Sequence, residues 1–558
     1  MAVALALPNN RDRSLAGPSR CSFTIFRIWN TPTRAMPQSP VDRPRKLVVI
    51  GLDGAEPSMM ERQIESGDLP NLSRLLDRSH AARTRNPYAL EAGAAWPVFH
   101  TGLMPGHQPL FDGQRYFDSD SYTYRWHDAD SVAPLLWERL SEHGKRCLVI
   151  DAPYARLNEE INGIMVLDFA AHVAANGTVM ELQSYPESVA GEILDAVGDD
   201  PTGGRTCDSR KLQSVADYRQ FIADYTLRVE KKASLTCHLL DRGPWDYVET
   251  VFTDLHCMGH HLWHVASPEH PEYDVRLHRA LGDPVRDGFT AIDSAVGRIL
   301  DRLDENTTVL FYVSHGMGPQ NTGTGLLDRV LLSIDTGRPG SSSRRTAKSL
   351  LRDLWQGLPG ELRGSSYLRA IRKPFAGALS ESTFLPDKES RRFFEVYANN
   401  ATGGIRLNIA GREAKGVVEP REVPEILADL RAALLECRNA ETGEPFVEDC
   451  VITRDHYDGE YLDYLPDMLL LWNRSAPIRI VESPRIGVVS QQYDGYRTGD
   501  HTPFGRILSS GPGIQPGRSD DDFHVVDFVP SILSFFSCDY DGLDGECRPM
   551  LFGLQGEE

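Results

Sequence analysis

Short apolar, β-branched runs alternate along the chain with segments whose apolar residues recur at helical spacing. Four of these runs end in a polar residue or a turn, and they lie at 46–54, 146–151, 247–254 and 308–314. Runs of this length and composition predict buried parallel strands. Before the last run, helical periodicity predicts an amphipathic helix over 283–303. The alternation predicts an α/β fold with a mainly parallel central sheet flanked by helices.

The pattern changes after about residue 320. A loop rich in Gly, Pro and Ser opens a basic segment, 338–392, which has twelve Lys and Arg against five Asp and Glu. This segment could hold an anionic group, or it could be a solvated helix face. A late apolar run at 467–472 predicts another buried strand. We expect residues 1–45 to be a disordered tail or an overlong start. The core would have a first part at 46–320 and a second part at 441–558, with an inserted cap or helical region at 321–440 between them.

The composition is that of a globular protein with an acidic surface. The chain has 558 residues, of which 41% are hydrophobic and 25% charged, and its formal net charge is −20. This charge argues against binding to nucleic-acid polymers or to an anionic membrane. It still allows a small anionic substrate that a local group of cations or metal ions would hold. No apolar run reaches the ~18–20 residues needed to span a bilayer.

Cysteine usage and the N-terminus bear on the compartment. Nine cysteines with no CxxC spacing do not suggest a disulfide framework, so we expect a reducing, cytoplasmic environment. The Arg-rich, acid-poor N-terminal segment could also be a transit peptide, and Met36 is an alternative start. The sequence does not indicate the oligomeric state.

Residues that bind metal ions follow the predicted strands. Ligands of open α/β sheets lie outside the carboxyl ends of the strands. Asp53 ends the first strand, His315 follows the fourth, and His501 lies near the C-terminus. His256 and His260 are four residues apart, so on a helix they share one face and can reach one ion, although an ordinary polar helix start has the same spacing. Imidazole and carboxylate groups at separate strand ends can converge on divalent metal ions.

The ordered set of motifs resembles the alkaline phosphatase superfamily, and more narrowly its type I phosphodiesterase/nucleotide pyrophosphatase branch. No single motif is decisive, but together they cover most of 46–553 in the expected order. The resemblance implies an alkaline phosphatase-like fold and a site, usually of two zinc ions, that clamps a phosphate or sulfate ester. The matching stretches are 49–54, 68–72, 95–102 with 105–107, 314–317, 404–408 with 411–412, and 501–513.

The resemblance also implies roles for single residues. Asp53, His260, His315 and His501 match metal-binding positions of the family. His256 stands where the family has the Asp of its Asp-x3-His motif, so metal binding there would have one negative charge less. Asp254 could supply the missing carboxylate, or it could be a solvated acid at a strand end.

Two departures concern the chemistry more directly. The Asp-His-Gly motif of the family begins here with Ser314, and a neutral serine is a poor zinc ligand. The position of the nucleophilic Thr or Ser, nine residues before Thr101, is Ala92. Covalent catalysis therefore cannot run through that residue. Glu91 is the nearest substitute, as metal ligand, general base or carboxylate nucleophile, or it is only a surface glutamate at a helix start.

We interpret the chain as a metal-dependent hydrolase of phosphoric esters of the phosphodiester or nucleotide type, or of related esters. The cofactor would be one or two divalent ions, most simply Zn²⁺, with metal-bound water as the nucleophile. His256, His260 and His501 would hold one ion, and Asp53 and His315 would hold a second ion or orient the first. The alternative is a catalytically inactive homologue that binds metal or an anion. Isomerase or phosphotransferase chemistry is a third, weaker interpretation.

Overall fold

The computed structural model describes eight stretches of the chain: 45–113, 115–127, 133–172, 180–205, 212–337, 388–399, 401–491 and 497–554. Residues 45–558 form one unit by their contacts. The predicted division of this unit into core and cap stays a prediction. Residues 338–387, which include most of the basic segment, lie outside the described residues.

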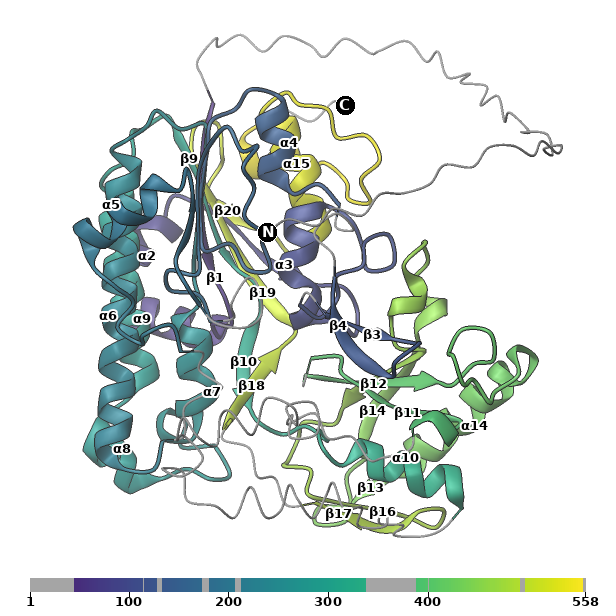
Figure 1. The fold of residues 1–558 in the computed structure, drawn as a ribbon. Coiled ribbons are helices and arrows are strands. Elements are labelled where there is room, and N and C mark those ends of the chain that lie inside the picture. Colours follow the sequence, from purple (N-terminus) through teal and green to yellow (C-terminus); the bar gives the residue numbers. More distant parts are fainter. Residues whose placement is uncertain are drawn as a thin grey trace, which may run out of the picture. The chain divides into compact units, whose positions relative to one another are not determined.

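A ten-stranded sheet forms the centre of this unit (Figure 1). Its strands are β1 (Lys46–Leu52), β2 (His80–Arg85), β5 (Cys147–Ile150), β6 (Gly163–Leu167), β7 (Gln183–Tyr185), β8 (Tyr247–Phe252), β9 (Thr307–Val313), β19 (Phe504–Ser510), β20 (Gly517–Arg518) and β21 (Phe523–His524). They lie in the order β20-β2-β19-β9-β1-β8-β5-β6-β7, with β21 beside β2. β1 runs parallel to β8 and β9, and β5 runs parallel to β8 and β6. The predicted fold class and the four predicted parallel strands are confirmed, while β7 and β19 run antiparallel to their neighbours.

Helices cover both faces of this sheet, as Figure 1 shows. One face carries α1 (Pro57–Ser66), α2 (Pro70–Leu76), α5 (Ser188–Val197), α6 (Val215–Leu240), α7 (Asp254–Ala266) and α9 (Pro284–Leu300), with α8 (Val275–Leu281) following α7. The other face carries α3 (Glu91–Thr101), α4 (Leu136–Glu142) and α15 (Phe528–Phe535). The predicted helix at 283–303 is α9, which begins at Pro284 after the side chain of Asp283 caps the backbone N–H of Arg286.

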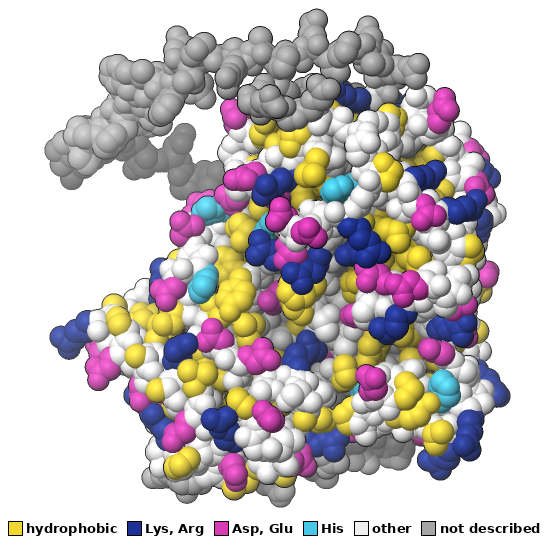
Figure 2. All heavy atoms as spheres, turned by 180° about the vertical axis from the view of Figure 1, so that it is seen from behind, with side chains coloured by type: hydrophobic (Ala, Val, Ile, Leu, Met, Phe, Trp, Pro, Cys, Tyr) yellow, Lys and Arg dark blue, Asp and Glu magenta, His cyan; other side chains and the backbone are white. Residues whose placement is uncertain are grey.

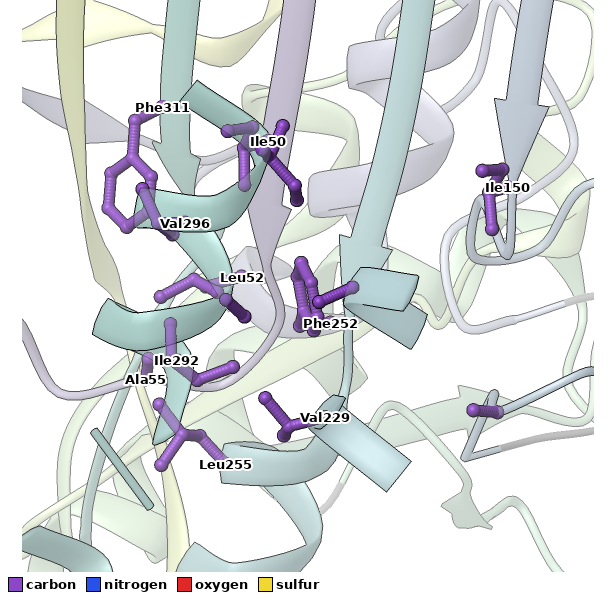
Figure 3. Close-up of a cluster of buried hydrophobic side chains, with 14 of the residues drawn as sticks. Ile50, Leu52, Ala55, Ile150, Val229, Phe252, Leu255, Ile292, Val296 and Phe311 are labelled. Carbon is purple, nitrogen blue, oxygen red and sulfur yellow. The ribbon is translucent and has the colours of Figure 1, made fainter. Parts of the chain in front are cut away.

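The core beneath α9 shows why the strands form where they do. Ile50 and Leu52 of β1 point to the same side of the sheet and meet Ile292 and Val296 of α9, with Phe311 of β9 beside them (Figure 3). All five side chains are buried. Burying a large apolar side chain contributes roughly 1.5–3 kcal/mol, so this layer fixes the register of β1 and with it the position of the residue that follows it, Asp53.

Smaller sheets lie beyond the carboxyl ends of the central strands. A four-stranded antiparallel sheet has the order β11-β12-β15-β14 and packs with α10 and α14, a three-stranded sheet has the order β13-β16-β17, and β3-β4 and β10-β18 are ribbons. The bounds are β3 (Arg115–Asp118), β4 (Thr123–Trp126), β10 (Gly316–Pro319), α10 (Leu327–Thr336), β11 (Phe393–Val396), β12 (Thr402–Leu407), α14 (Val423–Glu436), β13 (Arg438–Asn439), β14 (Val447–Ile452), β15 (Met468–Trp472), β16 (Ile480–Ser483), β17 (Gly487–Ser490) and β18 (Gly499–Thr502). The predicted strand at 467–472 is β15, in the four-stranded sheet and not in the central one.

The surface and the cysteines can be compared with the expectations. Acidic and basic side chains lie interspersed on the face that Figure 2 shows. Among the described residues, no helix combines the length and the apolar character needed to cross a bilayer. None of the seven described cysteines forms a disulfide, whereas Cys21 and Cys207 lie outside the described residues.

Candidate metal centre

Four elements bring the five predicted metal ligands together. Asp53 follows β1, His256 and His260 lie one turn apart on α7, His315 follows β9, and His501 lies within β18. The turn after Asp53 requires glycine, because Gly54 has a φ of +61° and a Cβ there would lie 2.9 Å from Nδ1 of His256. All five ligand side chains are buried. His501 differs from the expectation in one respect, since it lies inside a short antiparallel strand and not at a strand end.

Asp53 is held at the centre of the cluster. Its Oδ1 accepts hydrogen bonds from Nε1 of Trp96 at 2.8 Å and from Oγ of Ser314 at 3.0 Å. Oδ1 lies 3.3 Å from Nε2 of His315, and Oδ2 lies 2.9 Å from Nδ1 of His256. Burial opposes ionisation of this carboxyl, but the two histidines outweigh burial and hold the pKa of Asp53 well below its usual value. Asp53 is therefore a carboxylate at neutral pH.

The imidazoles of His256, His260 and His501 lie against one another. Nε2 of His256 and Nε2 of His260 are 3.0 Å apart. The ring centroid of His501 lies 4.7 Å from that of His256 and 4.8 Å from that of His260. His315 adjoins the three, with its ring centroid 4.3 Å from that of His501. Nitrogen lone pairs that face one another in this way are satisfied by a metal ion or by a proton, so the packed imidazoles could hold a metal ion.

Two of these histidines are strongly biased towards the neutral form. Burial lowers the pKa of His260 well below its usual value, and the neighbouring Arg497 and His256 lower it further. The pKa of His501 is also well below its usual value, because of burial and then the neighbouring histidines. Neutral imidazole is the form that binds metal ions, so both side chains have a lone pair available at neutral pH.

The donor atoms fit a divalent ion of the imidazole-binding kind. In three groups of residues, one donor atom from each residue lies within 4.8 Å of those from the others: His256–His315–His501, Asp53–His172–His256 and His260–Asp500–His501. Nε2 of His501 is buried and has no hydrogen-bond partner among the described residues. Nitrogen and carboxylate donors in such groups suit Zn²⁺ and similar ions.

The sequence analysis missed two members of these groups. Nδ1 of His172 lies 3.7 Å from Oδ2 of Asp53, and its ring centroid lies 4.2 Å from that of His256. Asp500 directly precedes His501 in β18 and is fully buried. His172 has no ligand spacing to any other candidate, so the sequence offers no signal for it. Asp500 was visible in the stretch before His501 but was not assigned a role.

Asp254 is not part of the histidine cluster that the described residues form. Its Oδ1 lies 3.3 Å from Nε of Arg228, which is fully buried on α6, and Asp254 belongs to none of the three ligand groups. Burial raises the pKa of Asp254 to about 6 although Arg228 opposes this shift. Asp254 and His256 are two positions apart on one helix and so point to different sides.

The structure also places the positions where the family resemblance fails. Ser314 donates its hydroxyl to Asp53 and so orients the carboxylate. Ala92 is buried in the first turn of α3 and offers no nucleophile. Glu91 begins the same helix, accepts the backbone N–H of Ala89 at 3.0 Å, and belongs to none of the ligand groups of the described residues. Burial raises the pKa of Glu91, with Arg474 opposing the shift.

The described part of the basic segment is paired with acidic residues. Nη1 of Arg391 lies 2.9 Å from Oδ1 of Asp328, and Nε of Arg392 lies 2.8 Å from Oδ1 of Asp335, both on α10. These two arginines therefore anchor β11 to α10.

The comparison with known families decides the relationship. The type I phosphodiesterase/nucleotide pyrophosphatase family model matches residues 47–504, a stretch that includes the whole histidine cluster. The chain belongs to this family. A comparison with curated proteins gave no significant match. In this type I phosphodiesterase/nucleotide pyrophosphatase family member, the buried His/Asp clusters could hold metal ions, and the central sheet with its flanking helices is consistent with an alkaline phosphatase-like fold.

Proposed function

We propose that this family member is a metal-dependent hydrolase of phosphoric esters of the phosphodiester or nucleotide type, with zinc as the most suitable ion. The observation that carries the proposal is the buried cluster of His256, His260 and His501 beside the ionised Asp53. A bound divalent ion would polarise the ester and lower the pKa of a coordinated water towards ~7.

The residues of the chain favour direct attack by water over a covalent route. Alanine at position 92 cannot form an ester with the substrate. Neutral imidazole at His256, where the family motif has a carboxylate, leaves more of the charge of the ion uncompensated. Both differences favour water as the nucleophile. The first removes the competing side chain, and the second makes the ion a stronger Lewis acid towards its bound water. Asp53, fixed by Trp96 and Ser314, holds His256 in place.

The environment of Arg474 favours an anionic substrate. Its Nη1 donates to the backbone carbonyl of His501, and its Nη2 is buried with no hydrogen-bond partner among the described residues. The backbone carbonyl of Arg474 accepts Nδ2 of Asn321 at 3.0 Å, which fixes the segment. A buried guanidinium nitrogen that lacks a partner is costly unless a ligand uses it. We propose that Nη2 binds a non-bridging oxygen of the ester.

Metal removal tests the proposed activity. The purified protein should hydrolyse bis-p-nitrophenyl phosphate or a phosphate or sulfate monoester, should lose turnover after dialysis against a chelator, and should regain it with Zn²⁺ or Mn²⁺. The control is the same dialysis followed by Mg²⁺ alone, which imidazole ligands bind poorly. Turnover that persists without metal contradicts the proposal. Stoichiometric metal without turnover on any of these esters would favour the inactive binding homologue, which the alanine at position 92 supports.

A substitution tests the role of Arg474. We expect Arg474→Met to lower kcat/KM about 10- to 100-fold, because a hydrogen bond from a charged donor contributes about 1.5–3 kcal/mol. Steady-state kinetics on the same ester measure the effect. The matched control is Arg454→Met, since Arg454 forms an exposed ion pair with Asp463, and its kinetics should stay within twofold of the wild type. Equal kinetics for both variants would show that Arg474 does not contact the substrate.

A further inference from the structure

The contacts of Nδ1 in three imidazoles indicate which nitrogen of each ring carries a lone pair. Nδ1 of His260 donates to the backbone carbonyl of Gly499 at 2.8 Å, and Nδ1 of His501 donates to Oδ1 of Asn399 at 3.2 Å. Nδ1 of His256 faces Oδ2 of Asp53 at 2.9 Å, although its N–H is not aligned for a regular hydrogen bond. A neutral imidazole with its proton on Nδ1 has its lone pair on Nε2. Each of the three rings therefore presents Nε2 as a ligand.

The rings of these three residues lie against one another, with the centroid of His501 4.7 Å from that of His256 and 4.8 Å from that of His260. The Nε2 atoms of His256 and His260 lie 3.0 Å apart, and that of His501 is buried without a partner among the described residues. The ring of His315 adjoins that of His501, but Nε2 of His315 lies 3.3 Å from Oδ1 of Asp53. Two lone pairs at hydrogen-bond distance repel each other unless a cation lies between them. The arrangement thus has the donor set of one metal ion, with a hydrogen-bond acceptor on Nδ1 of His260 and His501 and a carboxylate facing Nδ1 of His256.

The contacts of Asp53 show that its carboxylate is already in use. Oδ1 accepts hydrogen bonds from Trp96 and Ser314, and Oδ2 faces the Nδ1 side of His256. His172 also approaches Oδ2, at 3.7 Å. A second ion on Asp53 and His256 would have to bind Nδ1, the nitrogen that faces the carboxylate. The His256 ring would then bridge two ions and would have to lose its remaining proton.

We propose that this chain builds one metal site on Nε2 of His256, His260 and His501, and that Asp53 is a positioning residue for His256 and not a ligand of a second ion. The inference rests on the metal dependence of the proposed function. It goes beyond that function in the number of ions and in the role of Asp53. Carboxylates that orient a ligand histidine in this way strengthen metal binding about 10- to 100-fold.

Metal titration tests this inference without any measurement of activity. The chelator-dialysed full chain is titrated with Co²⁺, and bound metal is counted by elemental analysis. We expect one equivalent in the wild type. Asp53→Asn should keep one equivalent and the same visible spectrum, because the ligand set is unchanged, while its affinity falls about 10- to 100-fold. His260→Ala should change the spectrum or abolish binding. The matched control is Asp68→Asn, at a surface ion pair with Arg286, which should equal the wild type.

The outcomes separate this inference from the proposed hydrolase. Two equivalents in the wild type, with one lost in Asp53→Asn, would overturn the single-ion site and leave the hydrolase standing. A changed Co²⁺ spectrum in Asp53→Asn would identify Asp53 as a ligand and would also overturn the inference. No bound metal in the wild type would overturn both proposals. The wild-type count alone decides the number of ions, so the test holds even if a variant fails to fold.

Discussion

Replacing His260 with alanine should abolish hydrolysis almost completely, with kcat/KM falling by at least ~10³-fold, which is about 4 kcal/mol at 1.36 kcal/mol per tenfold change. The side chain is fully buried, its Nδ1 is fixed by the carbonyl of Gly499, and its Nε2 lies 3.0 Å from that of His256. Removing this imidazole leaves the proposed site on His256, His260 and His501 with two of the three protein donors that catalytic zinc sites use. Steady-state kinetics at saturating Zn²⁺ measure the loss.

The control for this variant is His143→Ala. His143 is exposed at the end of α4, where its Nδ1 contacts the carbonyl of Arg139, so the substitution should change kcat/KM less than twofold. Thermal unfolding of the chelator-treated proteins shows whether the alanine variant still folds. A folded His260→Ala protein with wild-type turnover would show that the histidine cluster is not the active site.

The fold could be predicted because the middle strands of the central sheet are mostly apolar. β1, β8 and β9 are buried on both faces, and such runs carry a strong signal. The run at 467–472 carries the same signal but forms β15 of the smaller antiparallel sheet. The composition of this run predicts that it is buried. Which sheet it joins depends on the strands with which it pairs. It pairs with β12 and β14, and the local sequence does not predict this pairing.

In the candidate site too, one local contact could be predicted from the sequence and one long-range contact could not. His256 and His260 share a helix face, so their contact follows from local geometry. His172 reaches Asp53 only because the chain after β6 passes over the end of β1, and it lies 84 positions before His256. Asp254 shows the reverse case, because its proximity in sequence suggested either a ligand or a solvated acid, whereas it is fully buried beside Arg228. On a helix, residues two apart face different sides, and Arg228 lies on the side that Asp254 faces.

Substitution of Lys232 should have the largest effect on stability. Lys232 is fully buried on α6, where its Nζ lies 2.8 Å from Oδ2 of Asp151 and donates to the carbonyls of Ala170 and Val251 at 2.9 and 2.7 Å. All three ammonium protons are thereby used. Asp151, which follows β5, also accepts the backbone N–H groups of Phe169 and Ala170. Lys232→Met should lower the free energy of unfolding by about 3–5 kcal/mol, because it leaves a buried carboxylate without its cation.

Urea unfolding of the wild type and the variant, followed by circular dichroism, measures this loss. The matched control is Lys415→Met, since Lys415 forms an exposed pair with Glu389, and such pairs contribute less than about 1 kcal/mol. The double variant Lys232→Met with Asp151→Asn should recover part of the loss, because the buried charge is then gone as well. Equal losses in the Lys232 and Lys415 variants would contradict the prediction. We also expect the substitution to disturb the histidine cluster. Lys232 lies one turn after Arg228, and Arg228 contacts Asp254 at the start of α7, the helix that carries His256 and His260.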